Sequence, residues 1–228
     1  MMENKDITLA KLQEAESLAM ELFSEAENRS LVRGGRTEKE ISEDIFGLAR
    51  EMFGIEKYWH KRIVRAGENT LCPYGENPPN LTVKDDDIVF LDFGPIFEDY
   101  EADVGRTYVL GDDPDKIRIT KDIEAAWAEI RDRVLSHESL TGAECYKFAV
   151  EAAENRGWEY GIEIAGHLVG RFPHERLPKG EKGLYMHLDN PNDIFAPAQD
   201  GSKRHWILEI QFVDRERKFG AFYEQLLM

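Results

Sequence analysis

Apolar residues recur at helical spacing in four segments of the chain. The segments are residues 5–28, 37–53, 116–135 and 141–156. Two of them open with a T-x-x-E capping box, formed by Thr37 with Glu40 and by Thr141 with Glu144. The stripe that begins after Thr37 stops at Gly54, a residue type that is common at helix ends. The pattern therefore predicts four helices.

Shorter apolar runs lie between and after these helices, and they predict strands. The runs are WHKRIV at 59–64, IVFLDFG at 88–94, DVGRTYVL at 103–110, HWILEIQFV at 205–213 and FGAFYEQLL at 219–227. The order of helices, strands, helices and strands indicates an α+β domain of two similar halves around one sheet. We expect residues 1–228 to form a single domain, because no low-complexity linker divides them and no separate amino-terminal domain is indicated.

Two of the predicted hairpins carry acidic residues inside apolar strands. A turn centred between Phe97 and Glu98 would place Asp92 directly opposite Asp103. Like charges that face each other destabilise a hairpin, so a positive partner is expected there.

The last hairpin repeats this arrangement. The charged turn DRERK separates Glu209 from Glu224, and a centre between residues 216 and 217 would make these two glutamates face each other. An unpaired buried carboxylate costs several kcal/mol, so four of them in one sheet require cations. Carboxylates combined with imidazole suit divalent Mn, Fe, Co or Zn. In the segment GIEIAGHLVGRFPHE, His167 stands among apolar residues and His174 follows seven residues later.

Simpler interpretations exist for each of these features. A facing pair of acids can arise by chance in a chain with 45 acidic residues, and a single His167 is more often a hydrogen-bonded core histidine. The remaining histidines are assigned to surface or structural roles; they are His60, His137, His187 and His205. The complete series of Asp, Asp, His, Glu and Glu on apolar strands favours a metal site.

Composition excludes several classes of protein. The 45 acidic residues outnumber 29 basic ones, and the formal charge of -16 would repel nucleic acid and anionic membranes. No uninterrupted apolar leader opens the chain, and no stretch reaches the roughly 18 apolar residues of a membrane span. Cys72 and Cys145 suggest neither a disulfide framework nor a thiolate metal site. We therefore expect a cytoplasmic protein with reduced cysteines, and a homodimer is compatible with the sequence.

The series of site residues resembles the pita-bread metallopeptidases, the superfamily of methionine aminopeptidase, aminopeptidase P, prolidase and the metal-free creatinase. The resemblance rests on the segments LDFGPIFEDYEADVGRT, GHLVGRFPHE, ILEIQF and FGAFYE, and it covers the chain from about residue 5 to its end. It implies the pita-bread fold, in which helices cover the outer face of a curved, pseudo-twofold antiparallel sheet. The chain looks most like a bare catalytic domain of the aminopeptidase P type.

The resemblance also implies a centre of two divalent metal ions. The implied ligands are Asp92, Asp103, His167, Glu209 and Glu224. Asp103 and Glu224 would touch both ions. Such a centre supplies hydroxide near neutral pH to attack the first peptide bond of a small peptide or an amino-acid-like amide. Glu209 would move the proton, and His174 would donate a hydrogen bond to the oxyanion. The implied activity is that of an Xaa-Pro aminopeptidase.

Positions around the substrate depart from the family pattern. Glu163 and Pro73 stand where proline-directed members have histidines, Gly105 replaces a threonine and Phe222 replaces an arginine. We assign Glu163 and the neighbour of Pro73, Tyr74, to substrate binding. These changes keep two alternatives open: an enzyme that acts on a small non-peptide C–N substrate, and a non-catalytic metal-binding protein.

Overall fold

The helices form where the sequence predicts them, and capping residues set their ends. The computed structural model describes residues 6–176 and 181–228. Its helices are α1 (Ile7–Asn28), α2 (Glu38–Phe53), the 3₁₀ helix η1 (Gly67–Leu71), α3 (Pro114–Leu135) and α4 (Gly142–Glu154). The side chains of Thr37 and Thr141 each accept a hydrogen bond from the backbone N–H three residues later, which confirms both capping boxes. Gly54 ends α2 in the left-handed conformation, with a φ of 68°.

Three of the predicted boundaries shift by about one half-turn. The helix predicted from residue 5, which lies outside the described residues, begins at Ile7 because Asp6 caps it. The helix α3 begins before the predicted residue 116, because Asp113 accepts backbone hydrogen bonds and Pro114 suits the first helical position. The helix α4 ends at Glu154, before the predicted residue 156.

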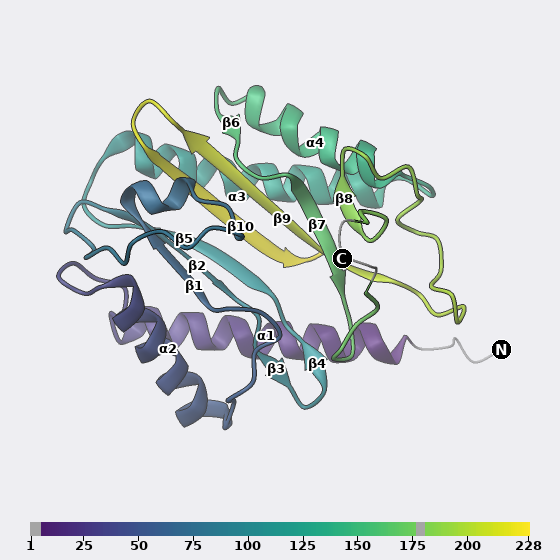
Figure 1. The fold of residues 1–228 in the computed structure, drawn as a ribbon, viewed down its shortest axis with the longest axis horizontal. Coiled ribbons are helices and arrows are strands. Elements are labelled where there is room, and N and C mark those ends of the chain that lie inside the picture. Colours follow the sequence, from purple (N-terminus) through teal and green to yellow (C-terminus); the bar gives the residue numbers. More distant parts are fainter. Residues whose placement is uncertain (1–5, 177–180) are drawn as a thin grey trace.

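One antiparallel sheet lies at the centre of the described chain (Figure 1). Its strands are β1 (Ile63–Ala66), β2 (Ile88–Phe93), β5 (Val104–Val109), β10 (Phe219–Leu226), β9 (His205–Asp214), β7 (Ile164–Val169) and β8 (Tyr185–His187) in spatial order, with β6 (Glu159–Tyr160) paired to β9. A small separate hairpin consists of β3 (Ile96–Phe97) and β4 (Tyr100–Glu101). The strands β5 and β10 join the two halves of the molecule at the middle of the sheet.

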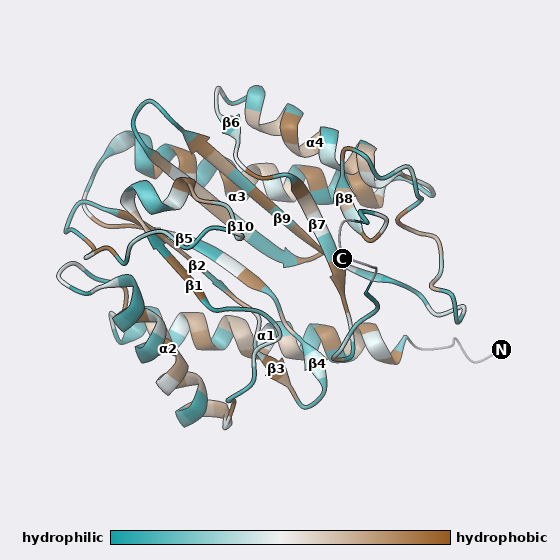
Figure 2. Ribbon diagram, viewed as in Figure 1, coloured by the Kyte–Doolittle hydropathy of each residue, from teal (hydrophilic) through white to brown (hydrophobic). Residues whose placement is uncertain are grey.

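Alternation along the strands separates two faces of the sheet. Val89, Leu91 and Phe93 of β2 pack against α1 and α2, whereas Leu208 and Ile210 of β9 belong to the core formed with α3 and α4. Figure 1 shows α1 and α2 beside the β1–β2 half and α3 and α4 beside the β9–β7 half. The intervening strand residues must point to the opposite face, because successive side chains alternate. Brown and teal stretches both occur along β9 and β10 and along each helix (Figure 2).

The register of the last hairpin is the predicted one, and that of the first hairpin is not. Glu224 pairs with Glu209 in the β9–β10 ladder. In the β2–β5 ladder Asp92 pairs with Gly105 rather than with Asp103. The predicted turn centre was one residue too early, because the β3–β4 hairpin turns after Glu98. Asp103 lies two positions before Gly105, the partner of Asp92, and side chains two positions apart on a strand point to the same face. Both carboxylates therefore still belong to the same face.

The strand predicted at 59–64 is also shifted. Regular pairing begins only at Ile63, which lies opposite Asp92. In the preceding segment the backbone N–H of Trp59 donates to the carbonyl of Gly94, and its indole N–H donates to the carbonyl of Ala102. Residues 59–62 therefore lie outside β1. Among residues 6–176 and 181–228, none of the helices combines the length and the apolar composition needed to cross a bilayer.

Candidate metal centre

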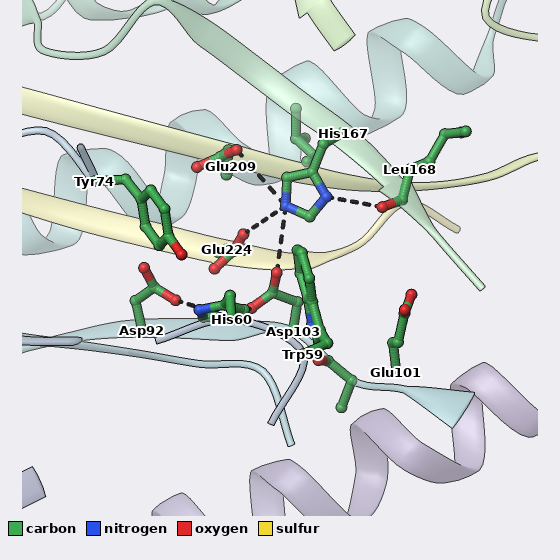
Figure 3. A network of polar contacts seen from close by, with 12 residues as sticks. Trp59, His60, Tyr74, Asp92, Glu101, Asp103, His167, Leu168, Glu209 and Glu224 are labelled. Atoms are coloured by element: carbon green, nitrogen blue, oxygen red, sulfur yellow. Dashed lines mark hydrogen bonds and ion pairs between the residues drawn. The ribbon is translucent and has the colours of Figure 1, made fainter. Parts of the chain in front are cut away.

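The four carboxylates predicted from the two hairpins gather around His167 on the sheet face opposite the helices (Figure 3). Asp92 lies on β2, Asp103 directly before β5, Glu209 on β9 and Glu224 on β10, while His167 comes from β7. The sheet order brings these strands together although they are far apart in sequence. Their side chains are almost completely enclosed, with exposed fractions from 2% for Asp103 to 12% for Glu209.

The imidazole of His167 joins three of the carboxylates. Its Nε2 lies 3.3 Å from Oδ2 of Asp103, 3.3 Å from Oε1 of Glu224 and 3.7 Å from Oε1 of Glu209. Its Nδ1 lies 2.9 Å from the carbonyl oxygen of Leu168. A neutral ring in this position donates its proton to that carbonyl, so the Nε2 lone pair points at the carboxylates.

A second histidine, His60, completes the other side of the cluster. We expected His60 at the surface or in a structural role, but its side chain is only 7% exposed and lies within the cluster. Its Nε2 is 3.0 Å from Oδ1 of Asp103 and 3.5 Å from Oδ1 of Asp92. The sequence carries no local signal for His60, because its place beside the carboxylates depends on the pairing of Ile63, three residues later, with Asp92.

Burial makes the charges of this cluster depend on one another. Burial raises the pKa of Asp92 to about 7 and the pKa of Glu209 to about 7. Burial would lower the pKa of His60, but the carboxylates of Asp103 and Asp92 outweigh it and raise that pKa to about 9. Burial also raises the pKa of Glu224 well above its ordinary value. Four carboxylates are therefore stable here only when protons or metal ions supply positive charge.

The donor atoms fit a pair of divalent ions. His60, Asp92 and Asp103 form one group whose ligand atoms lie within 4.8 Å of one another, and Asp103, His167 and Glu224 form a second. Asp103 is common to both groups. The Oε2 atom of Glu224 is buried and has no hydrogen-bond partner among the described residues. Because a buried carboxylate oxygen without a partner is costly, this atom is well suited to a cation.

His174 is held by a buried carboxylate that the sequence analysis did not single out. Its Nδ1 lies 2.7 Å from Oε2 of Glu101, and its backbone N–H donates to Oε1 of the same residue. Glu101 is 1% exposed and also accepts from the backbone N–H of Gly170. The ring of Trp59 lies between the two imidazoles, with centroids 5.2 Å from His167 and 5.4 Å from His174. This contact connects His174 to the cluster.

The two residues assigned to substrate binding occupy different surroundings. Tyr74 is half exposed, and its ring centroid lies 5.9 Å from that of His60, next to the cluster (Figure 3). Glu163 is exposed and lies directly before β7. Glu175, the neighbour of His174, forms an ion pair with Arg204 instead of facing the carboxylates. Tyr74 is thus the better placed of the two for a contact with a bound substrate.

Gly105 and Phe222, which both depart from the family pattern, are in contact and are compatible in size. Gly105 pairs with Asp92 on one side and with Glu224 on the other. A Cβ atom at this glycine would overlap the ring of Phe222. That ring packs with Ile63 and Phe90. An apolar cluster therefore lies on the same face of the sheet as the cage, the name used below for the four carboxylates together with His60 and His167.

Comparison with known proteins identifies related sequences and folds. The family model for metallopeptidase family M24 matches residues 10–223. The Xaa-Pro dipeptidase of Lactobacillus delbrueckii subsp. lactis is 27% identical over 193 residues, which cover 84% of this chain and 48% of the relative. The matches thus span between about a third and a half of the curated relatives' own lengths.

Two solved structures share the fold. The X-Pro aminopeptidase of Thermotoga maritima superposes with a TM-score of 0.73 at 24% identity, covering 95% of this chain and 56% of that chain. The methionine aminopeptidase of Rickettsia prowazekii gives a TM-score of 0.72 at 15% identity, and here 96% of this chain and 91% of the other are covered. The predicted pita-bread fold is confirmed by these superpositions.

Proposed function

Because this chain belongs to metallopeptidase family M24, we propose that it is a metal-dependent peptidase of the Xaa-Pro aminopeptidase type. The observation that carries the proposal is the position of Asp103, which belongs to both groups of potential ligand atoms. A carboxylate in that position suits a centre of two ions. The names of the relatives, Xaa-Pro dipeptidase and X-Pro aminopeptidase, support a peptide substrate.

The residues that would hold the ions are those predicted from the sequence. They are Asp92, Asp103, His167, Glu209 and Glu224. When bound, two divalent ions supply hydroxide near neutral pH and polarise the carbonyl that it attacks. The oxygen-rich donor set with imidazole is compatible with Mn, Fe, Co or Zn.

Two residues would handle the proton and the developing negative charge. The carboxylate of Glu209 lies 3.7 Å from Nε2 of His167 and keeps 12% side-chain exposure, so it suits proton transfer to and from a bound substrate. Nδ1 of His174 lies 2.7 Å from Oε2 of Glu101, and a ring that carries a proton on both nitrogens would donate from Nε2 to the substrate carbonyl oxygen. Both roles require a substrate bound next to Trp59 and Tyr74.

We also propose a cytoplasmic location. Both cysteines are free, Cys72 partly exposed and Cys145 buried, which suits a reducing compartment. The predicted homodimer stays a prediction.

The proposal is tested by metal analysis combined with a substrate screen. Gently purified protein is analysed for bound metals and then loaded separately with Mn, Co, Fe and Zn. Each form is offered Xaa-Pro dipeptides, longer Xaa-Pro peptides, Met-Xaa peptides and non-peptide amides. We expect two ions per chain and cleavage of the Xaa-Pro bond. Protein that binds two ions of each metal and hydrolyses none of these substrates would contradict the proposed activity.

One observation favours a second function, the hydrolysis of a small non-peptide C–N bond. Phe222 replaces the arginine of the family pattern, and with Phe90 and Ile63 it makes the neighbourhood of the cage apolar. These three apolar side chains themselves offer no charge to a peptide carboxylate. Cleavage of a non-peptide amide without cleavage of any Xaa-Pro peptide in the same screen would favour this alternative.

A further inference from the structure

We propose that His60 is a direct metal ligand, so that each of the two ions is bound by one imidazole. The inference rests on the proposed metal centre and adds a sixth protein ligand to the five that the sequence predicts. His60 comes from the segment between α2 and β1, where the sequence analysis expected no ligand.

The ring of His60 is oriented in the same way as the ring of His167. In each case Nδ1 lies next to the carbonyl oxygen of the following residue, at 2.7 Å from Lys61 and at 2.9 Å from Leu168. Each neutral ring therefore carries its proton on Nδ1 and directs the Nε2 lone pair into the cage. Nε2 of His60 meets Oδ1 of Asp103, whereas Nε2 of His167 meets Oδ2 of the same carboxylate. The two imidazoles thus lie on opposite sides of Asp103.

The distances around His60 suit shared coordination. Two ligand atoms that are each about 2.1 Å from one ion, at angles between 90° and 110°, are separated by roughly 3.0 to 3.5 Å. The Nε2 atom of His60 lies 3.0 Å from Asp103 and 3.5 Å from Asp92. A lone pair and two carboxylate oxygens at these separations repel one another unless a proton or a metal ion lies among them.

The pseudo-twofold arrangement of the sheet gives an independent reason. Counted outward from the centre, each half contributes an acid from its inner strand, an acid from its middle strand and a histidine from its outer strand or the segment leading into it. The two sets are Asp103, Asp92 and His60 in the first half, and Glu224, Glu209 and His167 in the second. His60 therefore occupies the position in the first half that His167 occupies in the second.

Two hydrogen bonds of Trp59 and a ring contact hold the segment that carries His60. The backbone N–H of Trp59 donates to the carbonyl of Gly94, and its indole N–H donates to the carbonyl of Ala102. The indole packs edge to face on His60, with centroids 4.5 Å apart. Gly94 has no side chain at the point where a Cβ atom would overlap the imidazole of His60. A ligand held in this way is positioned before any ion binds.

A second imidazole changes which metals the centre prefers. Imidazole suits Zn, Co and Fe, whereas sites made of carboxylate and water suit Mn. With His60 as a ligand, neither ion is held by oxygen atoms alone. We therefore expect the purified protein to select Zn, Co or Fe over Mn at equal concentrations.

The test compares His60→Ala and His60→Gln with His205→Ala. His205 is a matched control, since it is buried and its Nε2 lies 3.4 Å from a carboxylate oxygen of Asp6, away from the cage. The glutamine variant keeps a polar side chain in case the alanine variant does not fold. Metal binding is measured by calorimetric titration with Zn²⁺. Direct ligation is measured by ring ¹⁵N NMR of zinc-loaded protein labelled at histidine.

We expect the parent and His205→Ala to bind two zinc ions and to show two zinc-bound imidazole nitrogens. Both His60 variants should show one such nitrogen, and one of the two ions should bind at least about 100-fold more weakly than in the parent. A loss of this size exceeds the loss of affinity expected when a residue that only hydrogen-bonds to a ligand is removed. A parent spectrum in which Nε2 of His60 still carries a proton would overturn the assignment, as would unchanged affinity in both variants. A parent that binds no zinc at all would instead overturn the proposed metal centre.

Discussion

Glu209 and Glu224 lie directly opposite each other on β9 and β10, with both side chains almost completely enclosed. Facing carboxylates at this position oppose strand pairing unless they share positive charge. The sheet nevertheless keeps a continuous ladder from Phe219 to Leu226 across them. The stability of this half of the molecule should therefore depend on the cations that the carboxylates bind.

Replacing Asp103 should remove the carboxylate that both groups of ligands share. In Asp103→Ala we expect metal content to fall sharply. Added metal should also no longer raise the melting temperature of this variant, because a bound ligand stabilises only the protein that binds it. Metal content is measured by elemental analysis after gel filtration. The matched control is Asp99→Ala, which removes an exposed aspartate paired with Arg171 on the nearby turn. Full metal stoichiometry in Asp103→Ala would show that the site is misassigned.

Metal-free protein should become less stable as the pH rises. Burial raises the pKa of Asp92 and that of Glu209 from ordinary values of 3.8 and 4.5 to about 7, so their stabilisation is present at low pH and is lost as the pH rises through about 7. Burial would lower the pKa of His60, but Asp103 and Asp92 raise it from 6.5 to about 9, so its contribution is lost between those values.

The melting temperature is measured from pH 5 to pH 9 under two conditions. One series contains chelator, and the other contains added metal and no chelator. We expect a falling melting temperature without metal and a smaller fall, or a rise, with metal, because metal ions replace the protons. A metal-free protein that is more stable at pH 9 than at pH 5 would contradict this account of the cluster.

His174→Ala should separate metal binding from turnover. The imidazole has no contact with the four carboxylates among the interactions of the described residues, and its proposed partner is the substrate oxyanion. We expect metal content to match the parent and kcat to fall about 100-fold or more, which corresponds to roughly 3 kcal/mol of transition-state stabilisation. Lost metal would make His174 a ligand, and unchanged kcat would give it a structural role.

Glu101→Gln should impair His174 without removing it. The buried carboxylate accepts hydrogen bonds from Gly170 and twice from His174, and an amide retains only part of this acceptor capacity. We expect a loss of stability of about 1–3 kcal/mol from the buried group and a fall in kcat of about 10-fold or more, with an altered pH profile. The pH profile distinguishes a positioning role from simple destabilisation, which would leave its shape unchanged.

Gly105 and Phe222 should show coupled effects on stability. A threonine at residue 105 would collide with the ring of Phe222, so Gly105→Thr should cost about 1–3 kcal/mol from overpacking. Combining it with Phe222→Ala should recover part of that loss, because the ring is the nearest obstacle and Cβ of Glu224 is the next. The coupling free energy is obtained from urea unfolding of the two single variants and the double variant. Additive losses would show that the two substitutions are independent.

The sequence alone indicated most of the fold and the five residues that we propose as metal ligands. Helical stripes and capping boxes located the four helices, because the side chains that form these signals are close in sequence. Single acids inside apolar strands stood out for a physical reason: a buried carboxylate is too costly to occur by accident in several strands. The register of the last hairpin could also be deduced, since a short charged turn connects its strands.

Only the tertiary structure decided the features that depend on contacts between distant segments. The β3–β4 hairpin moved the first register, and the segment before β1 brought His60 beside Asp103, which is 43 residues away in the chain. In the same manner Glu101 contacts His174, which is 73 residues away in the chain. No local periodicity encodes such encounters, because they depend on how the sheet and its loops pack together. The sequence thus specified which strands carry the carboxylates, and the packing of loops around them decided which other side chains reach the site.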